Sequence, residues 1–163
     1  MNALVVYYSR TGTTRKVAEK LASLLKCVSE EIHDITNRKG RLGWLRAGKD
    51  ATSKKLTKLE KVNNNPASYD IVVIGTPTWN GRMSTPIRTY LTQYKDRFKK
   101  VAFFCTYQYT DNNPFEEMES LCGKTPVATL RLHRKQEVEA NQYIKKAEEF
   151  IDRFNQSYGE EKT

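Results

Sequence analysis

Short apolar runs alternate along the chain with stretches in which apolar residues recur every three or four positions. The runs predict five β-strands, at 3–8, 28–32, 69–74, 101–105 and 126–132, and the periodic stretches predict helices at 15–25, from about 85, at 115–121 and at 140–154. The first, third and fourth runs are apolar throughout, which is typical of parallel strands buried on both faces. The second and fifth are more polar or alternate in character, which is typical of sheet edges. The pattern predicts a doubly wound α/β domain with a parallel sheet over residues 1–163, whose last residues, 159–163, should fray.

Residues 36–65 interrupt this alternation between the second and third runs. The segment contains a short amphipathic pattern in which Leu42 and Leu45 are predicted to face the core. We interpret Trp44 as a plug over the core, with an anchor for a ligand or partner as the alternative. Long excursions are more often lids or partner sites than spacers.

Charge is concentrated in the same region. The chain of 163 residues has a formal net charge of +9, and residues 38–61 contain nine Lys and Arg against two acidic residues, a net +7. A basic surface attracts acidic partners or nucleic acid at long range, although an ordinary solvated surface explains it equally well. Since no nucleic-acid-binding motif accompanies the charge, we expect no nucleic-acid partner.

Composition narrows the classes of protein to which the chain can belong. The mean hydropathy is −0.71 and no apolar run approaches 18 residues, so a membrane span is not expected. The chain starts directly in a strand, without the pattern of a signal peptide. The three cysteines are widely spaced, which favours reduced thiols in the cytoplasm. The two histidines have no neighbouring set of ligands, so no metal site is expected.

A hydroxyl-rich loop joins the first strand to the first helix, and it is the strongest candidate site. Residues 9–14 read Ser-Arg-Thr-Gly-Thr-Thr. This is neither a Walker A loop nor a Gly-x-Gly-x-x-Gly fingerprint. Backbone N–H groups, hydroxyls and the helix dipole at such a position suit a phosphate. The alternative is an ordinary helix start capped by Thr13 or Thr14.

Two further loops follow the third and fourth predicted strands, and both carry aromatic residues. In a doubly wound sheet, ligands bind beyond the carboxyl ends of the strands, so these loops should meet the first one. A phosphate site beside Trp79, Tyr107 and Tyr109 suits a flat, phosphorylated ring.

These three segments together resemble the flavodoxin family, whose phosphate loop has the pattern Ser/Thr-x-Thr-Gly-x-Thr. The chain is similar to short-chain members, because no room remains after residue 126 for an additional loop in the fifth strand. The resemblance implies a five-stranded flavodoxin-like sheet with strand order 2-1-3-4-5 and non-covalently bound FMN. It also implies three groups of cofactor-binding residues: Ser9, Arg10, Thr11, Gly12, Thr13 and Thr14 at the phosphate; Thr76, Pro77, Thr78, Trp79, Asn80 and Gly81 along one side of the ring; and Thr106, Tyr107, Gln108 and Tyr109 along the other.

Within these groups the resemblance implies particular roles. Trp79 would stack on the isoalloxazine, and Tyr107 or Tyr109 would cover its other face. The Asn80–Gly81 peptide would respond to the redox state of the ring, since glycine permits positive φ. The basic charge departs from the family, whose members are usually acidic, and Arg82 is expected to stabilise the reduced, anionic ring.

Two functions remain open. The first is an electron carrier that passes electrons between redox partners, with the basic segment 38–61 recruiting an acidic partner protein. The second is an FMN-dependent NAD(P)H:flavin or quinone oxidoreductase of the same fold, with the 36–65 excursion folded over a substrate. The oligomeric state is left open by the sequence.

Overall fold

The computed structural model describes residues 1–109 and 113–159, with side chains through residue 156. The strands are β1 (Ala3–Tyr7), β2 (Val28–Glu31), β3 (Ile71–Trp79), β4 (Arg82–Met83), β5 (Lys100–Tyr107) and β6 (Thr129–His133), and the α-helices are α1 (Thr13–Leu25), α2 (Gly40–Thr52), α3 (Thr85–Tyr94), α4 (Phe115–Cys122) and α5 (Ile144–Gly159). The predicted fraying of 159–163 falls on residues that, apart from Gly159, lie outside the described ranges.

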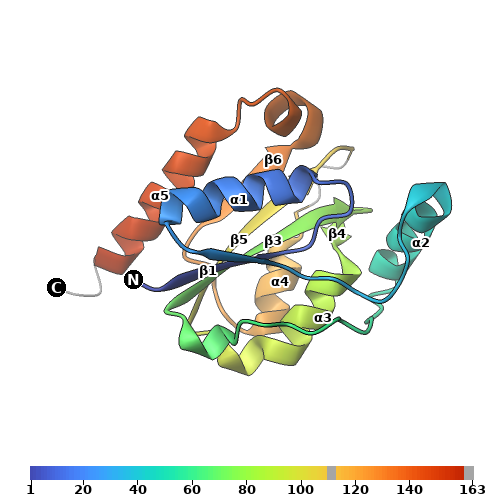
Figure 1. Ribbon diagram of the computed structural model, residues 1–163, viewed down its shortest axis with the longest axis horizontal. Helices are drawn as coiled ribbons and strands as arrows, with labels where there is room; N and C mark the ends of the chain where they lie inside the picture. Colours follow the sequence, from blue (N-terminus) through green and yellow to red (C-terminus); the bar gives the residue numbers. More distant parts are fainter. Residues whose placement is uncertain (110–112, 160–163) are drawn as a thin grey trace.

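Five parallel strands form the central sheet in the order β2-β1-β3-β5-β6 (Figure 1). β4 is a two-residue antiparallel extension that pairs with the end of β3. The predicted doubly wound, five-stranded topology is therefore confirmed. The two more polar runs do form the edges. On edge strand β2, the buried carboxylate of Glu30 accepts hydrogen bonds from the backbone N–H groups of Asn63 and Asn64 at 2.6 and 2.9 Å.

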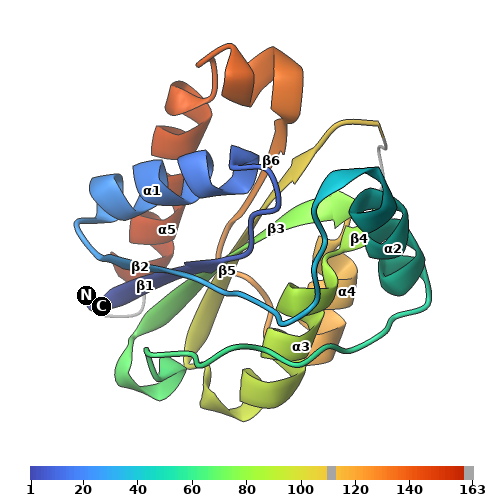
Figure 2. The same cartoon turned by 45° about the vertical axis from the view of Figure 1, so that its right-hand side comes forward.

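Helices cover both faces of the sheet (Figures 1 and 2). Because successive side chains of a strand point to opposite faces, Val5 and Val73 pack with α1 and α5, whereas Val6 and Ile74 pack with α3 and α4. The two apolar layers hold all five parallel strands with their carboxyl ends at the same edge. None of the helices within 1–109 and 113–159 has the length and apolar character that a membrane span requires.

Two strands run further than the apolar runs predict. β3 continues through Gly75 and Pro77 to Trp79, and β5 continues to Tyr107. Pairing explains the extension, because Thr76 and Pro77 stay in register with Cys105 and Thr106. The expected second loop is thus the end of a strand and a tight hairpin, which fixes its residues more rigidly than a loop would.

The interpretation of α2 is wrong in its orientation. Leu42 and Leu45 are 82% and 59% exposed, and Trp44 is 52% exposed, so none of them faces the core or plugs it. The inward face instead consists of small residues and one acid: Gly43, Ala47, Asp50 and Ala51. Small residues are required at close contacts: a Cβ atom on Gly43 would lie 2.2 Å from the carbonyl carbon of Arg38, just before the helix, and Gly48 also lies close to the β3–β4 hairpin, where a Cβ atom would be 2.9 Å from the Asn80 amide.

Charged and polar contacts hold the 36–65 segment in place. The buried guanidinium of Arg38 donates to Asp34 at 3.0 Å and to Asp50 at 2.8 Å, and so joins the start of the segment to α2. On the return, the N–H of Thr57 donates to Oγ1 of Thr89 on α3 at 3.0 Å. The segment is therefore a fixed layer at one end of the molecule.

The last helix begins later than its apolar pattern predicts. A π-helical turn, Arg134–Glu139, precedes it, and Asn141 has a positive φ of 57° that separates the two. Ala140, predicted as part of the helical stripe, is exposed outside α5, and Val138 occupies the core position instead.

Candidate functional site

The first site segment connects β1 to α1. Gly12 is the N-cap residue of α1, with φ of 91° and no capping side chain, so the predicted cap at Thr13 or Thr14 is wrong. The hydroxyl of Ser9 instead accepts the N–H of Gly12 at 3.1 Å and shapes the loop. Within the described residues, no acceptor is found for the N–H groups of Thr13, Thr14 and Arg15, and the first turn contains no acidic side chain. These donors, with the helix dipole, leave the loop able to bind an anion.

This loop is tied directly to the third site segment. The hydroxyls of Thr14 and Thr106 lie 2.9 Å apart and are buried. The bond joins the start of α1 to the end of β5 and sets the distance between the two segments.

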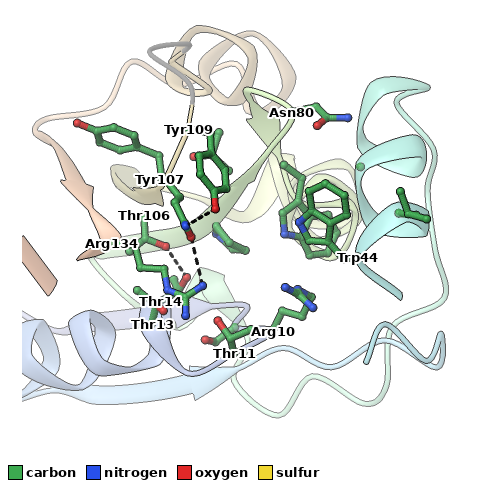
Figure 3. A pocket seen from close by; sticks show the side chains of 17 residues that line it. Arg10, Thr11, Thr13, Thr14, Trp44, Asn80, Thr106, Tyr107, Tyr109 and Arg134 are labelled. Atoms are coloured by element: carbon green, nitrogen blue, oxygen red, sulfur yellow. Dashed lines mark hydrogen bonds between the residues drawn. The ribbon is translucent and has the colours of Figure 1, made fainter. Parts of the chain in front are cut away.

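Beyond this bond, all three predicted segments contribute to one cavity of about 260 Å³ at the carboxyl edge of the sheet (Figure 3). Thirteen of the sixteen predicted residues line it: Ser9, Arg10, Thr11, Thr13, Thr14, Pro77, Thr78, Trp79, Asn80, Thr106, Tyr107, Gln108 and Tyr109. Gly12, Thr76 and Gly81 do not. Thr76 is buried, and its hydroxyl accepts the N–H of Ser84 at 2.9 Å, so its role is structural.

The β3–β4 hairpin contributes Asn80, which lies at the upper edge of the cavity in Figure 3. Asn80 and Gly81 have φ values of 49° and 75°, the pattern of a type I′ turn. The Asn80 side chain donates to Thr52 at the end of α2 at 3.3 Å. Thr78 adds a buried hydroxyl in the cavity wall with no oxygen or nitrogen partner among the described residues.

The aromatic residues differ in how much ring surface they leave free. Trp79 is 8% exposed, and it packs edge-on against Tyr8 with ring centres 5.5 Å apart. The Tyr107 ring packs beneath the guanidinium of Arg131 at 4.3 Å and against His133 at 5.3 Å, and Figure 3 shows it directed away from the cavity. Tyr109 is 82% exposed, and its hydroxyl accepts from Gln108 at 2.6 Å.

Among the described residues, four that line the cavity are outside the predicted set: Trp44, Leu45 and Gly48 of α2, and Arg134. For Trp44, an anchor for a ligand is the alternative to a plug over the core that the sequence leaves open. Arg134 follows β6, so the rule that ligands gather at the carboxyl ends of strands could have found it. Its guanidinium donates to Gln108 at 3.3 Å and pairs with Glu139 at 2.6 Å. Leu45 and Gly48 carry no comparable signal, because the sequence pattern does not say which face of α2 meets the cavity.

The charge that faces the cavity comes from Arg10 and Arg134 rather than from Arg82. Arg82 lies outside the lining and pairs with Glu117 at 3.3 Å, and the same carboxylate also pairs with Arg88 at 2.8 Å. By contrast, no ion pair to Arg10 occurs among the described residues. The influence of Arg82 on a bound ring therefore stays a prediction, and of the two arginines that line the cavity only Arg10 has no ion pair among the described residues.

Taken together, the cavity has a polar end and an aromatic end. Hydroxyls, unpaired N–H groups and Arg10 lie at the polar end, and aromatic and aliphatic side chains lie at the other. The cavity is slightly smaller than is usual for a site that encloses its ligand. It suits a flat molecule with one anionic group and one edge left in water, and FMN meets this description.

Comparisons with known proteins agree with this geometry. A flavodoxin family model matches residues 2–126. A flavoprotein from Lactobacillus acidophilus, solved in complex with FMN, is 26% identical, with a TM-score of 0.69 over 85% of this chain and 97% of that one. Two flavodoxins share the fold with TM-scores of 0.57: flavodoxin 2 of Bacillus cereus, 19% identical over 93% of this chain and 99% of that one, and the two-electron reduced flavodoxin of Megasphaera elsdenii, 15% identical over 90% and 96%. No curated protein is significantly similar in sequence. The family match covers most of the chain, and the chain belongs to the flavodoxin family.

Proposed function

We propose that the protein binds FMN non-covalently and passes electrons between redox partners. The observation that carries the proposal is the joining of an uncapped helix start to an aromatic cavity through the Thr14–Thr106 bond. The bond fixes the start of α1 relative to the end of β5, so it would set the distance between a bound anion and a flat ring. The Lactobacillus acidophilus protein, similar in fold and sequence, binds FMN, which supports the same cofactor here.

Each part of the cavity has a role in this proposal. The N–H groups of Thr13 and Thr14, with the hydroxyls of Ser9 and Thr11, would hold the phosphate, and Arg10 would offset its charge. Bound FMN supplies the redox chemistry, because it accepts and releases electrons one or two at a time. Arg10, which lines the cavity and has no ion pair among the described residues, would favour the more negative, reduced state of the ring by Coulombic attraction.

The surface beside the cavity supports a protein partner. The buried, paired Arg38 does not belong to it, but the other eight basic residues of 38–61 are exposed. Three of them lie on α2, the helix that carries Trp44: Arg41, Arg46 and Lys49. We propose an acidic redox protein as the partner, because a basic surface next to the cavity would steer it to the ring edge. All three cysteines are free, and we place the protein in the reducing cytoplasm.

Reconstitution with FMN followed by stepwise anaerobic reduction tests the proposal. The purified protein should take up one FMN per chain, and the reductive titration should show a distinct one-electron stage. Rapid reduction by NAD(P)H alone, in a single two-electron stage, would favour an oxidoreductase instead. A protein that cannot take up FMN would overturn both functions.

A further inference from the structure

We propose that Trp44 of α2 and Tyr109 form the two walls of the flavin ring site, in place of Trp79 and Tyr107. The inference rests on the proposed FMN binding and adds to it a residue from the 36–65 segment, outside the three site segments. Its starting point is that four aromatic side chains line the cavity but differ in the ring surface they leave free.

Trp79 and Tyr107 have their ring surfaces committed to the protein. The indole of Trp79 meets the edge of Tyr8, and the guanidinium of Arg38 lies over it at 5.4 Å. Arg38 is itself fixed by two buried ion pairs, so moving it off the indole would cost free energy by breaking them. The Tyr107 ring is covered in the same way by Arg131 at 4.3 Å. A ligand that stacked on the same face of either ring would have to displace the cation there.

The side chains of Trp44 and Tyr109 are, by contrast, largely exposed. Both line the cavity and both are more than half exposed. Figure 3 shows Trp44 on the α2 side of the cavity and Tyr109 across from it, with Arg10 and Thr11 at the lower end. A flat ring placed between them would cover large apolar surfaces that are otherwise in water, and stacking on aromatic faces adds to that gain.

Trp44 is also held in place, as a ring-positioning residue must be. α2 packs through Ala47 and Ala51, which are buried, and through Gly48, where a Cβ atom would lie 2.9 Å from the Asn80 amide. Since Asn80 belongs to the hairpin at the rim, α2 and the rim are fixed relative to each other. Trp44 is therefore presented by a rigid element at little entropic cost.

The test uses the emission of bound FMN together with its dissociation constant. An indole in contact with a flavin quenches its fluorescence by donating an electron to the excited ring, a phenol does the same, and a phenylalanine ring cannot. Trp44→Leu should raise the Kd for FMN about tenfold, which corresponds to about 1.4 kcal/mol. Because the Tyr109 phenol would still quench the bound flavin, the emission is compared in a Tyr109→Phe background, where Trp44→Leu should raise it several-fold. In the same background Trp44→Phe should also raise the emission while leaving the Kd within about threefold, because it keeps a stacking face.

Two further variants complete the comparison. Tyr109→Leu should raise the Kd for FMN as Trp44→Leu does. Leu42→Ala, on the same helix and outside the cavity lining, should change neither the Kd nor the emission. Because Trp44 is half exposed, the melting temperature of the apoprotein should be unaffected in the Trp44 variants, which separates loss of stacking from loss of fold.

The outcomes distinguish the inference from the proposed function. If wild-type protein binds FMN and Trp44→Leu leaves both Kd and emission unchanged, the inference is overturned and FMN binding stands. If Trp79→Phe restores emission and Trp44→Phe does not, Trp79 is the stacking residue after all. If wild-type protein binds no FMN, the proposed function fails and the inference fails with it.

Discussion

Gly12 tests the phosphate site at the scale of one residue. Its φ of 91° disfavours any other residue, although a Cβ atom there would meet no atom within 4 Å. We expect Gly12→Ala to cost about 1–2 kcal/mol of unfolding free energy through backbone strain. Relaxation of the strain would move the N–H groups that point at the phosphate. The affinity for FMN should therefore fall about tenfold more than the affinity for riboflavin, which has no phosphate.

Gly123 provides the matched control. It also has a positive φ, of 65°, and open space around its Cβ position, but it ends α4 away from the cavity. Gly123→Ala should lower stability by about 1 kcal/mol without changing the ratio of FMN to riboflavin affinity. Equal loss of both ligands in Gly12→Ala would contradict a phosphate role for the loop. Denaturant unfolding and fluorescence titration provide the two readouts.

At the same scale, the limits of sequence reasoning are visible in the aromatic residues. The hydroxyl-rich loop could be predicted because its chemistry is local: the residues and the helix start are contiguous. Which aromatic ring is free could not be predicted, because the answer depends on remote partners. Arg38 covers Trp79, and Arg131 covers Tyr107, from positions 41 and 24 residues away in the sequence.

At the scale of elements, α2 is the part of the fold that its sequence describes least well. An amphipathic reading assigns the leucines to the core, since leucine is usually buried. The inward face instead consists of small residues: Gly43 lies against the backbone of Arg38 just before the helix, Ala47 is buried, and Gly48 lies against Asn80 of the hairpin. Strands β1, β3 and β5 could be predicted because parallel strands buried on both faces leave an unambiguous apolar run.

A substitution of Arg38 tests whether its ion pairs hold α2 in place. Its side chain is 2% exposed and joins two carboxylates, of which Asp34 is as buried as Arg38 itself. Arg38→Met would leave both carboxylates buried without a guanidinium, so we expect a loss of about 3–5 kcal/mol in unfolding free energy. Trp44 should become mobile at the same time, with weaker FMN binding. Arg46→Met, the same change at an exposed position of α2, should stay within about 0.5 kcal/mol of wild type. Equal effects would mean that the ion pairs do not hold α2.

At the scale of the whole molecule, the order of elements and the family resemblance together were enough to predict the sheet. Five alternations of strand and helix with right-handed crossovers leave few topologies, and the resemblance in three separate segments selected one of them. The distribution of charge in space was less predictable. The net +7 counted for 38–61 includes Arg38, which is buried and neutralised, whereas Arg41, Arg46 and Lys49 share one helix beside the cavity.

This arrangement of charge predicts which proteins exchange electrons with the reduced protein. The reduced protein should reduce an acidic ferredoxin at least tenfold faster at low ionic strength than at 0.2 M salt. At 0.2 M salt the Debye length falls below 10 Å, so the salt screens the attraction between the two proteins. Basic cytochrome c should show the opposite trend. Arg46→Glu combined with Lys49→Glu should remove most of the salt dependence with the acidic protein. Lys145→Glu, an exposed site on α5 across the sheet, should change it little. A salt-independent rate with the acidic protein, or equal effects of the α2 and α5 variants, would show that the basic surface of α2 serves no docking role.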